Sequence, residues 1–270
     1  MSTIDELFTK LRSENRKALM PFITAGDPDL DFTAAVIEEL VARGASMCEV
    51  GIPYSDPIAD GPVIQESYTR ALGRGIKVHD ILRTLGAVAL RVNAPLVTMV
   101  SHAIIYRQGM EKYADALQEK SIAGMIVPDL PVEESSQLAA ICRARDLSLI
   151  QLVTPTTPRD RALKIAETSS GFLYYVAVAG ITGERSAVPP ELQERVGWLR
   201  EQTSLPVCIG FGISQPAHVR VLGPVADGLI VGSAVVRRMA GAETSPRDQT
   251  LRQVADYVSS LLAALDGSLP

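Results

Sequence analysis

Residues 18–41 read ALMPFITAGDPDLDFTAAVIEELV, and this stretch contains the unit that decides the fold. An apolar run, Ala18–Thr24, is followed by a turn and then by a helical pattern over Leu30–Val41. The turn, TAGDP over residues 24–28, is not the G-x-G-x-x-G turn that a doubly wound open sheet usually shows after its first strand. The first unit therefore favours a barrel over its rival, the open sheet.

The same strand-and-helix unit recurs along the chain. The expected strands are Ala18–Thr24, Met47–Ile52, Leu96–Val100, Gly124–Val127, Ser148–Val153, Phe172–Val178, Val207–Gly210 and Gly228–Val231. These runs are apolar without alternation, which is typical of parallel strands buried on both faces. Eight of them alternating with helices, with no polar linker between halves, predict an α/β fold, a (β/α)8 TIM barrel, in a single domain over residues 1–270.

Helix start signals place some of the boundaries. An extra N-terminal helix is predicted by an apolar stripe at i, i+3, i+4 and i+7, formed by Ile4, Leu7, Phe8 and Leu11. Thr3 and Glu6 have capping-box spacing at its start. Thr157 and Pro158 are expected to be the N-cap and the first residue of a later helix, and Pro189-Pro190 to open another.

The interval after the second strand is unusually long. Strand starts mostly lie 22 to 34 residues apart, but 49 residues separate Met47 from Leu96. A barrel keeps its chemistry in the loops at the C-terminal ends of its strands. We therefore expect an enlarged, functional loop at this position.

Composition excludes several classes of protein. A net charge of −5 argues against a nucleic-acid-binding surface, and no apolar run approaches the ~18 residues of a membrane span. The first residues are charged and lack the apolar core of a signal peptide, which predicts a cytoplasmic location. The three cysteines and three histidines lack the spacing of a disulfide framework or a zinc site, so buried thiols and no metal are expected.

Glu49 lies inside the second apolar run, MCEVGI. A carboxylate in a buried strand is costly unless it is protonated, paired or functional. A buried ion pair is the structural alternative, but no other expected strand carries Lys or Arg within its apolar run. We therefore expect Glu49 to have a raised pKa and to give and take protons.

The loop that follows, GIPYSDPIADGP over residues 51–62, offers two more carboxylates. Asp56 and Asp60 have the alternative of being turn or helix-capping residues. For Asp56 the two interpretations are evenly balanced. Asp60 follows Glu49 by eleven residues at the same mouth of the barrel, which favours a paired-carboxylate role.

Glycine turns follow three consecutive strands, at residues 180–183 (GITG), 210–214 (GFGIS) and 232–234 (GSA). Bare backbone N–H groups at helix starts attract phosphate, and barrels often bind it after strands seven and eight. Tight turns alone would explain each glycine but not their clustering. None of the six lysines ends a strand at this rim, which excludes a Schiff-base aldolase and leaves carboxylate-driven proton transfer on a phosphorylated substrate.

Six motifs, in order along nearly the whole chain, resemble the tryptophan synthase α subunit family. They are FITAGDP (22–28), EVGIPYSDPIADGP (49–62), VPDLPVEE (127–134), GITG (180–183), GFGIS (210–214) and GSA (232–234). The resemblance implies a TIM-barrel lyase of tryptophan biosynthesis. Such an enzyme cleaves indole-3-glycerol phosphate to indole and glyceraldehyde 3-phosphate by retro-aldol chemistry.

The resemblance also implies roles for individual residues. Glu49 matches the general acid/base, which protonates indole C3 and takes the proton from the glycerol hydroxyl, and Asp60 matches the carboxylate that holds the indole N–H. The matching phosphate ligands are Gly183, Gly212, Gly232 and Ser233. The matching pocket residues are Phe22, Ile64, Tyr174, Thr182 and Phe211, with Asp129 near the site.

The partner implied by the resemblance is the β subunit, a pyridoxal-phosphate enzyme that receives indole through a tunnel in an α2β2 heterotetramer. The α chain itself would need no cofactor. Pro53, Asp56 and Pro57 match the loop that communicates with this partner.

Two departures affect the pocket and the partner surface. Ser101, Ala103 and Ile104 stand where the family usually has Tyr, Asn and Pro, and Ala177 and Val178 stand where polar residues are frequent. His102 is a candidate compensating group, the alternative being a solvated loop histidine.

Three functions stay open at this point. The chain is expected to be the α subunit of a two-subunit enzyme, a free-standing indole-3-glycerol-phosphate lyase that releases indole, or a regulatory subunit that only binds ligand. The presence of Glu49 and Asp60 argues against the regulatory function. Indole release measured with and without a β subunit separates the three.

Overall fold

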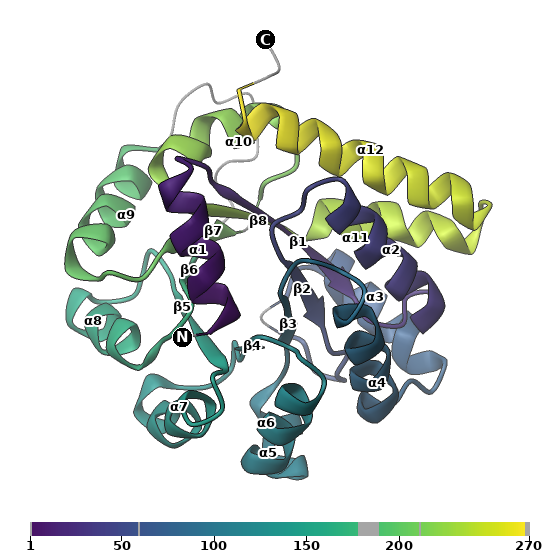
Figure 1. The fold of residues 1–270 in the computed structure, drawn as a ribbon, viewed down its shortest axis with the longest axis horizontal. Coiled ribbons are helices and arrows are strands. Elements are labelled where there is room, and N and C mark those ends of the chain that lie inside the picture. The colour runs from purple at the N-terminus through teal and green to yellow at the C-terminus, as the bar shows by residue number, and fades with distance from the viewer. Residues whose placement is uncertain (1, 59, 178–188, 211, 268–270) are drawn as a thin grey trace.

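A computed structural model describes residues 2–58, 60–177, 189–210 and 212–267. Eight parallel strands form a closed barrel in chain order, with the last strand hydrogen-bonded to the first. The strands are β1 (Ala18–Thr24), β2 (Cys48–Gly51), β3 (Leu96–Met99), β4 (Gly124–Ile126), β5 (Ser148–Val153), β6 (Leu173–Val176), β7 (Val207–Gly210) and β8 (Gly228–Val231). Helices surround the strands (Figure 1), so the predicted (β/α)8 TIM barrel is confirmed.

The predicted strand bounds agree closely with the observed ones. β1, β5, β7 and β8 have the predicted bounds, whereas the other four strands are one to three residues shorter. Residues such as Met47, Ile52 and Val100 are buried although they lie just outside the strands. Burial therefore extends past the hydrogen-bonded ladder, and apolar pattern alone overestimates strand length.

The helices described are α1 (Thr3–Ser13), α2 (Leu30–Ala42), α3 (Pro62–Gly73), α4 (Val78–Ala89), α5 (His102–Gln108), α6 (Met110–Glu119), α7 (Ser135–Arg143), α8 (Arg159–Thr168), α9 (Pro190–Gln202), α10 (Pro216–Leu222), α11 (Ser233–Met239) and α12 (Arg247–Leu265). Short 3-10 turns are η1 (Val132–Glu134), η2 (Gly223–Val225) and η3 (Ala240–Glu243). Among the residues described, no helix combines the length and apolar character needed to cross a membrane.

The capping box of α1 lies one position before the predicted pair, Thr3 and Glu6. Ser2 Oγ accepts a hydrogen bond from Asp5 N at 3.2 Å, and the Asp5 carboxylate accepts one from Ser2 N at 2.9 Å. Ser2 Oγ also lies 2.9 Å from Ser148 Oγ at the start of β5. This contact between distant segments selects Ser2 as the cap.

The predicted start of α8 is also wrong by one residue. Pro158 is the N-cap and not the first helical residue. Thr157 Oγ1 instead accepts from Thr154 N at 3.0 Å and closes the preceding turn. The predicted opening of α9 at Pro189-Pro190 is confirmed, with Pro190 as its first residue.

Helix α1 lies across the N-terminal end of the barrel (Figure 1). Its Ile4, Phe8 and Leu11 side chains are buried and join the cluster that fills the barrel interior. The Phe8 and Phe172 rings pack with centroids 5.9 Å apart. This packing closes one end of the barrel, and the chemistry has to be sought at the other end.

The interval after β2 contains the predicted excursion. It consists of a loop from Ile52 to Gly61, then α3 and α4 before β3. The three cysteines, Cys48, Cys142 and Cys208, are buried and free, which confirms their interpretation as packing residues.

Candidate active site

A cavity of about 460 Å³ opens at the C-terminal ends of the strands. It draws its walls from β1, the loop after β2, β6 and the turns after β7 and β8. The predicted site residues that line it are Phe22, Asp60, Ile64, Tyr174, Gly212, Gly232 and Ser233. Residues far apart in the sequence therefore converge because parallel strands place their C-terminal ends on one rim.

Glu49 is not among the residues that line this cavity, but its strand partner Phe22 is, so the carboxyl lies directly behind the cavity wall. It is fully buried in β2, in register with Phe22 of β1 and Val97 of β3. No described residue hydrogen-bonds either of its carboxylate oxygens. Burial raises the pKa of Glu49 from 4.5 to about 8, so the group holds a proton at neutral pH.

Asp60 faces the cavity from the loop before α3. Tyr54 donates a hydrogen bond from its hydroxyl to Asp60 Oδ2 at 3.4 Å. Burial raises the pKa of Asp60, and the bond from Tyr54 opposes that shift. The N-cap of α3 is Gly61, so the Asp60 side chain is not the helix cap. Its backbone carbonyl accepts from Gln65 Nε2 at 2.8 Å, which fixes the loop.

Tyr174 lies within the electrostatic influence of both carboxyl groups. Burial raises the pKa of its phenol well above the usual range, and the charges of Glu49 and Asp60 add to the shift. Both carboxyl groups are therefore close enough to act on the same ring. A Cβ atom on Gly210 would come within 2.3 Å of the Tyr174 hydroxyl oxygen, so only glycine at this position leaves room for the ring.

The apolar wall of the cavity is also part of the core. Phe22 and Ile64 are almost fully buried and cluster with Tyr68 and Val236. A Cβ on Gly51 would lie 2.5 Å from Phe22 Cζ, so this strand end must be bare for the Phe22 ring to fit. The wall is therefore rigid, with its shape set by core packing.

The opposite wall is formed by the glycine turns. Gly212 has a φ of +78°, a conformation that favours glycine. Gly232 has ordinary space around it, because a Cβ there would lie 3.7 Å from Phe22. Packing would therefore tolerate a side chain at position 232. The absence of one leaves the backbone before Ser233 open to the cavity. The predicted Gly183, Thr182 and Phe211, together with Val178, lie outside the described residues.

Arg237 is a lining residue that the sequence reasoning missed. It lies on α11 four residues after Ser233, hence one turn further along the same helix face. Its side chain is exposed and makes no hydrogen bond or ion pair with a described residue. The sequence could have indicated this residue, because a cation four positions after Ser233 falls on the same face of a helix that begins at the GSA turn.

Asp129 is not among the residues that line the cavity. Its two carboxylate oxygens accept hydrogen bonds from Ser101 Oγ and His102 N, both at 2.7 Å. Ser101 Oγ in turn accepts from Ala103 N at 3.3 Å as the N-cap of α5. The carboxylate thus orders the start of α5, and Ser101 is explained as a helix cap.

Of the three loop residues expected to contact a partner, only Asp56 is exposed, Pro57 is half-buried and Pro53 is buried. Asp56 accepts a hydrogen bond from Ser55 Oγ at 2.6 Å. The Pro57 carbonyl accepts from Gln65 Nε2 at 3.1 Å. Ile58, next in the loop, has 93% of its surface exposed.

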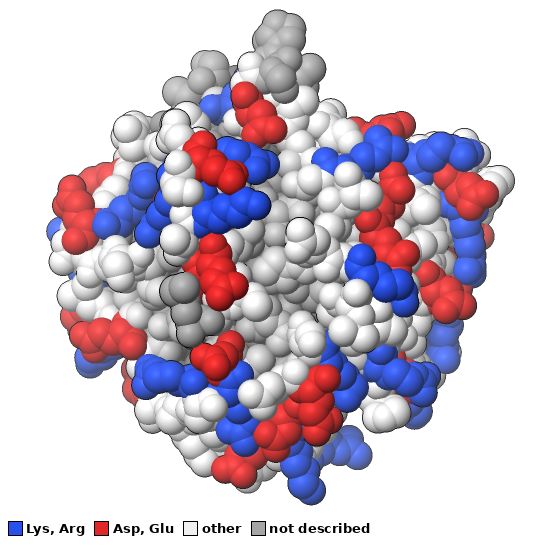
Figure 2. Space-filling model, in the orientation of Figure 1, with Lys and Arg blue, Asp and Glu red and all other residues white. Residues whose placement is uncertain are grey.

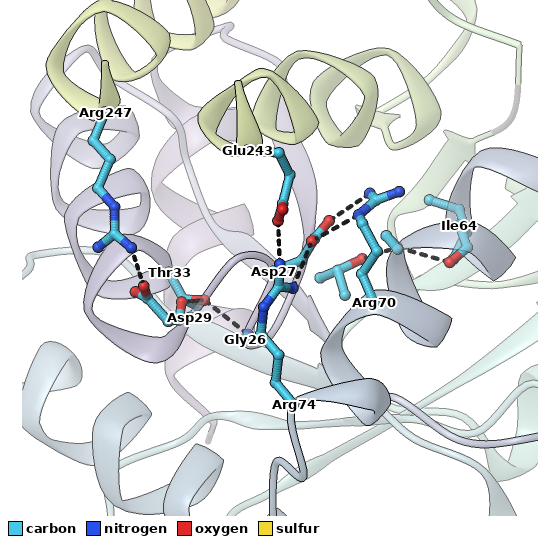
Figure 3. A network of polar contacts seen from close by, with 11 residues as sticks. Gly26, Asp27, Asp29, Thr33, Ile64, Arg70, Arg74, Glu243 and Arg247 are labelled. Atoms are coloured by element: carbon cyan, nitrogen blue, oxygen red, sulfur yellow. Dashed lines mark hydrogen bonds and ion pairs between the residues drawn. The ribbon is translucent and has the colours of Figure 1, made fainter. Parts of the chain in front are cut away.

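A polar network behind the site attaches α3 to the end of β1 (Figure 3). The Arg70 guanidinium donates two hydrogen bonds to the buried Asp27 carboxylate, at 3.0 Å and 2.7 Å. Thr24 Oγ1 and Ser67 Oγ lie 2.6 Å apart. Arg74 reaches both Asp27 and Glu243. These contacts hold the helix whose first turn follows Asp60.

The site therefore combines a protonated buried carboxyl, a second carboxyl on a tethered loop, an apolar wall and a wall of backbone and cationic groups. This arrangement suits proton transfer on a flat apolar group joined to an anion. Across the part of the chain that the structure describes, no group of three or more His, Cys, Asp or Glu side chains could hold a metal ion.

Comparison with known proteins shows extensive similarity. A sequence model of the family "Tryptophan synthase alpha chain" matches residues 8–265. The tryptophan synthase alpha chain of Rhodopirellula baltica is 55% identical, covering 99% of this chain and 100% of that protein. The tryptophan synthase alpha chain of Prochlorococcus marinus is 47% identical, covering 89% of this chain and 88% of that protein.

Solved structures agree. The tryptophan synthase subunit alpha of Legionella pneumophila superposes with a TM-score of 0.91 at 33% identity, covering 99% of both chains. A ligand-free tryptophan synthase from M. tuberculosis superposes with a TM-score of 0.87 at 29% identity, covering 98% of this chain and 99% of that chain.

Proposed function

The chain belongs to the tryptophan synthase alpha chain family, and we propose how its residues carry out the reaction of that subunit. It is an enzyme subunit of tryptophan biosynthesis, a lyase that cleaves indole-3-glycerol phosphate. The family membership also implies a β-subunit partner.

We assign the proton transfers to Glu49. With its pKa raised to about 8, it carries a proton at neutral pH and delivers it to indole C3. This breaks the aromaticity of the ring and places positive charge on the ring nitrogen. The carboxylate of Glu49 then takes the proton of the glycerol hydroxyl beside the C3 substituent bond. That bond breaks, its electron pair returns to the ring, indole and the aldehyde are released, and Glu49 is protonated again.

Asp60 is proposed to hold the indole N–H. Its carboxylate accepts that hydrogen bond and stabilises the positive charge that develops when C3 is protonated. Tyr54, which donates to Asp60 Oδ2, lowers the pKa of Asp60 against the effect of burial and so favours the ionised form. We propose that Asp60 acts as the ionised carboxylate beside the protonated Glu49.

The substrate's two ends are proposed to occupy opposite walls. The indole ring packs against Phe22, Ile64 and Tyr174, and the phosphate lies at Gly212, Gly232 and Ser233, with Gly183. Arg237 adds a full positive charge at the rim of that wall. Thr182 and Phe211 are proposed to complete the pocket, with Asp129 acting indirectly by ordering the start of α5.

A single observation supports the acid/base role most strongly. Glu49 is a fully buried carboxyl, in the interior of the barrel beside the cavity, for which no described residue supplies a hydrogen bond. Such a group is costly to keep unless its proton is used.

Glu49→Gln tests this role. The amide keeps the shape of the side chain but cannot transfer a proton, so indole release should fall to less than about 1% of the wild-type rate. Binding of glycerol phosphate, measured by calorimetry, should persist because the glycine wall is intact. The control is Glu39→Gln, which alters an exposed pair with Arg43 and should leave the rate unchanged. Retention of a tenth or more of the rate by Glu49→Gln would sink the assignment.

The partner surface is proposed to include Pro53, Asp56 and Pro57, with the exposed Ile58 beside them. Ala103 and Tyr106 on α5 extend it, since α5 follows β3 at the same end of the barrel. The assembly is proposed to be an α2β2 heterotetramer, with pyridoxal phosphate in the β subunit and no cofactor on this chain. The alternative, a free-standing lyase, predicts full activity without the partner.

Two further expectations from the sequence stay predictions. One is the organisation of residues 1–270 as a single domain. The other is a cytoplasmic location.

A further inference from the structure

A second cavity, of about 430 Å³, lies at the N-terminal end of the barrel, opposite the active site. It forms where the end of α1, the turn between α9 and β7, and the residue before β8 meet. Phe8 and Leu11 contribute apolar surface to its lining. Figure 2 shows this face of the molecule, with Lys and Arg side chains gathered beside the end of α1.

Asp227 supplies the negative charge in this cavity, and its oxygens are already engaged. Oδ2 accepts a hydrogen bond from Val207 N at 2.9 Å and lies 3.6 Å from Arg12 Nη2. Oδ1 accepts from Arg200 Nη2 at 3.3 Å. The buried carboxylate therefore has a structural function, and one arginine would neutralise it.

The cavity carries more positive charge than the neutralisation of Asp227 requires. Arg12, Arg16, Lys17 and Arg200 all line it, in a protein whose net charge is −5. Lys17 is half-buried and has no hydrogen bond or ion pair with a described residue. Burial lowers the pKa of Lys17, and Arg200 and Arg12 lower it further, while Asp227 opposes them. Two carboxylates oppose these four cations, namely Asp227 and the exposed Glu14, which pairs with Arg16 at 3.1 Å, so the positive charge is only partly compensated.

Two of the three arginines, Arg12 and Arg200, are held in place before any ligand arrives. Arg12 Nη1 donates to the Ser204 carbonyl at 3.1 Å, and Arg200 Nη1 donates to the Val225 carbonyl at 3.4 Å. Fixed guanidinium groups lose little conformational freedom when an anion binds. Lys17 supplies a mobile ammonium beside them.

We propose that this cavity is a binding site for phosphate, either the free ion or a phosphate monoester of a small metabolite. The oxyanion lies between Lys17, Arg12 and Arg16, and the cavity volume leaves room for a small organic group. Arginine and lysine donors match phosphate oxygens in geometry and charge. Because the site lies at the opposite end of the barrel from Glu49, its occupant does not compete with the substrate.

Thermal unfolding in phosphate tests the site in solution. Inorganic phosphate is titrated to about 50 mM at constant ionic strength, and a ligand of millimolar affinity should raise the Tm of the wild type by about 5 °C. Lys17→Met should lose at least half of that rise. Lys10→Met, an exposed lysine on α1 that does not line the cavity, should keep it. The active-site phosphate wall contributes equally to all three proteins.

A second arm uses ribose 5-phosphate in place of inorganic phosphate. The part of the shift that depends on Lys17 is the difference between Lys10→Met and Lys17→Met, and a larger difference at equal concentration identifies the monoester as the preferred ligand. Crystals soaked in tungstate locate the oxyanion directly by anomalous scattering, with a peak expected beside Lys17. The indole-release rate of Lys17→Met should equal that of the wild type. Equal phosphate responses of Lys17→Met and Lys10→Met, or a tungstate peak without any such difference in solution, would identify an adventitious ion only and overturn the proposal.

Discussion

At the Glu49 carboxyl, burial and the lack of a described hydrogen-bond donor act in the same direction. Both disfavour the charged form, and the result is a pKa of about 8 for a group whose ordinary value is 4.5. A carboxylic acid that keeps its proton at neutral pH is a proton donor of suitable strength for a weakly basic ring carbon. The same burial makes Glu49 a source of pH-dependent stability.

The sign of this stability effect follows from the proton count. Between pH 4.5 and about 8 the folded protein holds a proton that the unfolded chain has released. The free energy of unfolding should therefore fall as the pH rises through this window, by roughly 3 kcal/mol between about pH 6 and about pH 9. Urea unfolding of wild type and Glu49→Gln at both pH values checks this, since the variant should lack this component. Parallel pH profiles of the two proteins would contradict it.

The activity should respond to the same ionisation. Glu49 must be protonated to begin the reaction, so kcat/KM should decrease about tenfold per pH unit once the pH exceeds the pKa of about 8. A pH series of initial rates measures this decrease. A rate that is constant to about pH 10 would assign the proton donor to another group.

Asp60 gives a separate prediction because its role is electrostatic. Asp60→Asn keeps the size of the side chain and removes the negative charge, so kcat should fall by about 100-fold or more. Asp56→Asn is the matched control, being an exposed aspartate in the same loop, and it should keep the kcat of the isolated chain. Equal effects of the two variants would leave Asp60 without a specific role.

At the scale of elements, α3 is the helix on which the site depends. Its first turn follows Asp60, its Ile64 lines the cavity, and its Ser67 and Arg70 attach it to the end of β1. The attachment includes a buried carboxylate, Asp27, whose charge is compensated mainly by Arg70 (Figure 3). A buried ion pair of this kind adds little net stability by itself, but removing one partner is strongly destabilising because the other charge is left buried and uncompensated.

Arg70→Met should destabilise the protein by about 3 kcal/mol, because Asp27 stays buried with only Arg74 at 3.8 Å nearby. The double variant Asp27→Asn, Arg70→Met should recover much of this loss, since no uncompensated charge is left. Arg91→Met is the control, because it breaks an exposed pair with Glu38 and should cost less than about 1 kcal/mol. Urea unfolding measures all three, and similar losses for Arg70→Met and Arg91→Met would refute the buried-charge explanation.

At the scale of the whole molecule, the two ends of the barrel carry different features. The C-terminal end carries the cavity of the reaction and the exposed apolar side chains Ile58 and Tyr106, with exposures of 93% and 75%. The N-terminal end is closed by α1 and carries the cationic cavity. Partner binding is therefore expected at the first end and not at the second.

Tyr106→Asp tests the position of the partner surface. A charge at this exposed ring should weaken binding of a β subunit by about tenfold or more, measured as the concentration needed for half-maximal activation of indole release. Leu90→Asp is the control, since Leu90 is 81% exposed but lies at the end of α4, which leads to the N-terminal end of β3. If both variants bind the β subunit as the wild type does, α5 is not part of the interface.

The bounds of four strands could be predicted from local sequence alone. β1, β5, β7 and β8 have their predicted bounds because apolar runs of the correct length are bounded by polar and turn residues. The capping box of α1 was predicted at Thr3 and Glu6 but lies at Ser2 and Asp5, since a contact with Ser148 of β5 influences the choice. Such contacts are invisible in a local window.

Some features of the candidate site are likewise visible in the sequence, whereas others depend on tertiary contacts. Glu49 and the glycine turns were identifiable from the chain, because a carboxylate within an apolar run and bare turns at three strand ends break the local pattern. The proximity of Tyr174 to both carboxyl groups, the helix-ordering bonds of Asp129 and the lining position of Arg237 come from the closed barrel. Pattern along a chain reports which side chains are buried or bare, whereas contacts between strands and helices far apart in sequence depend on how the barrel closes and packs.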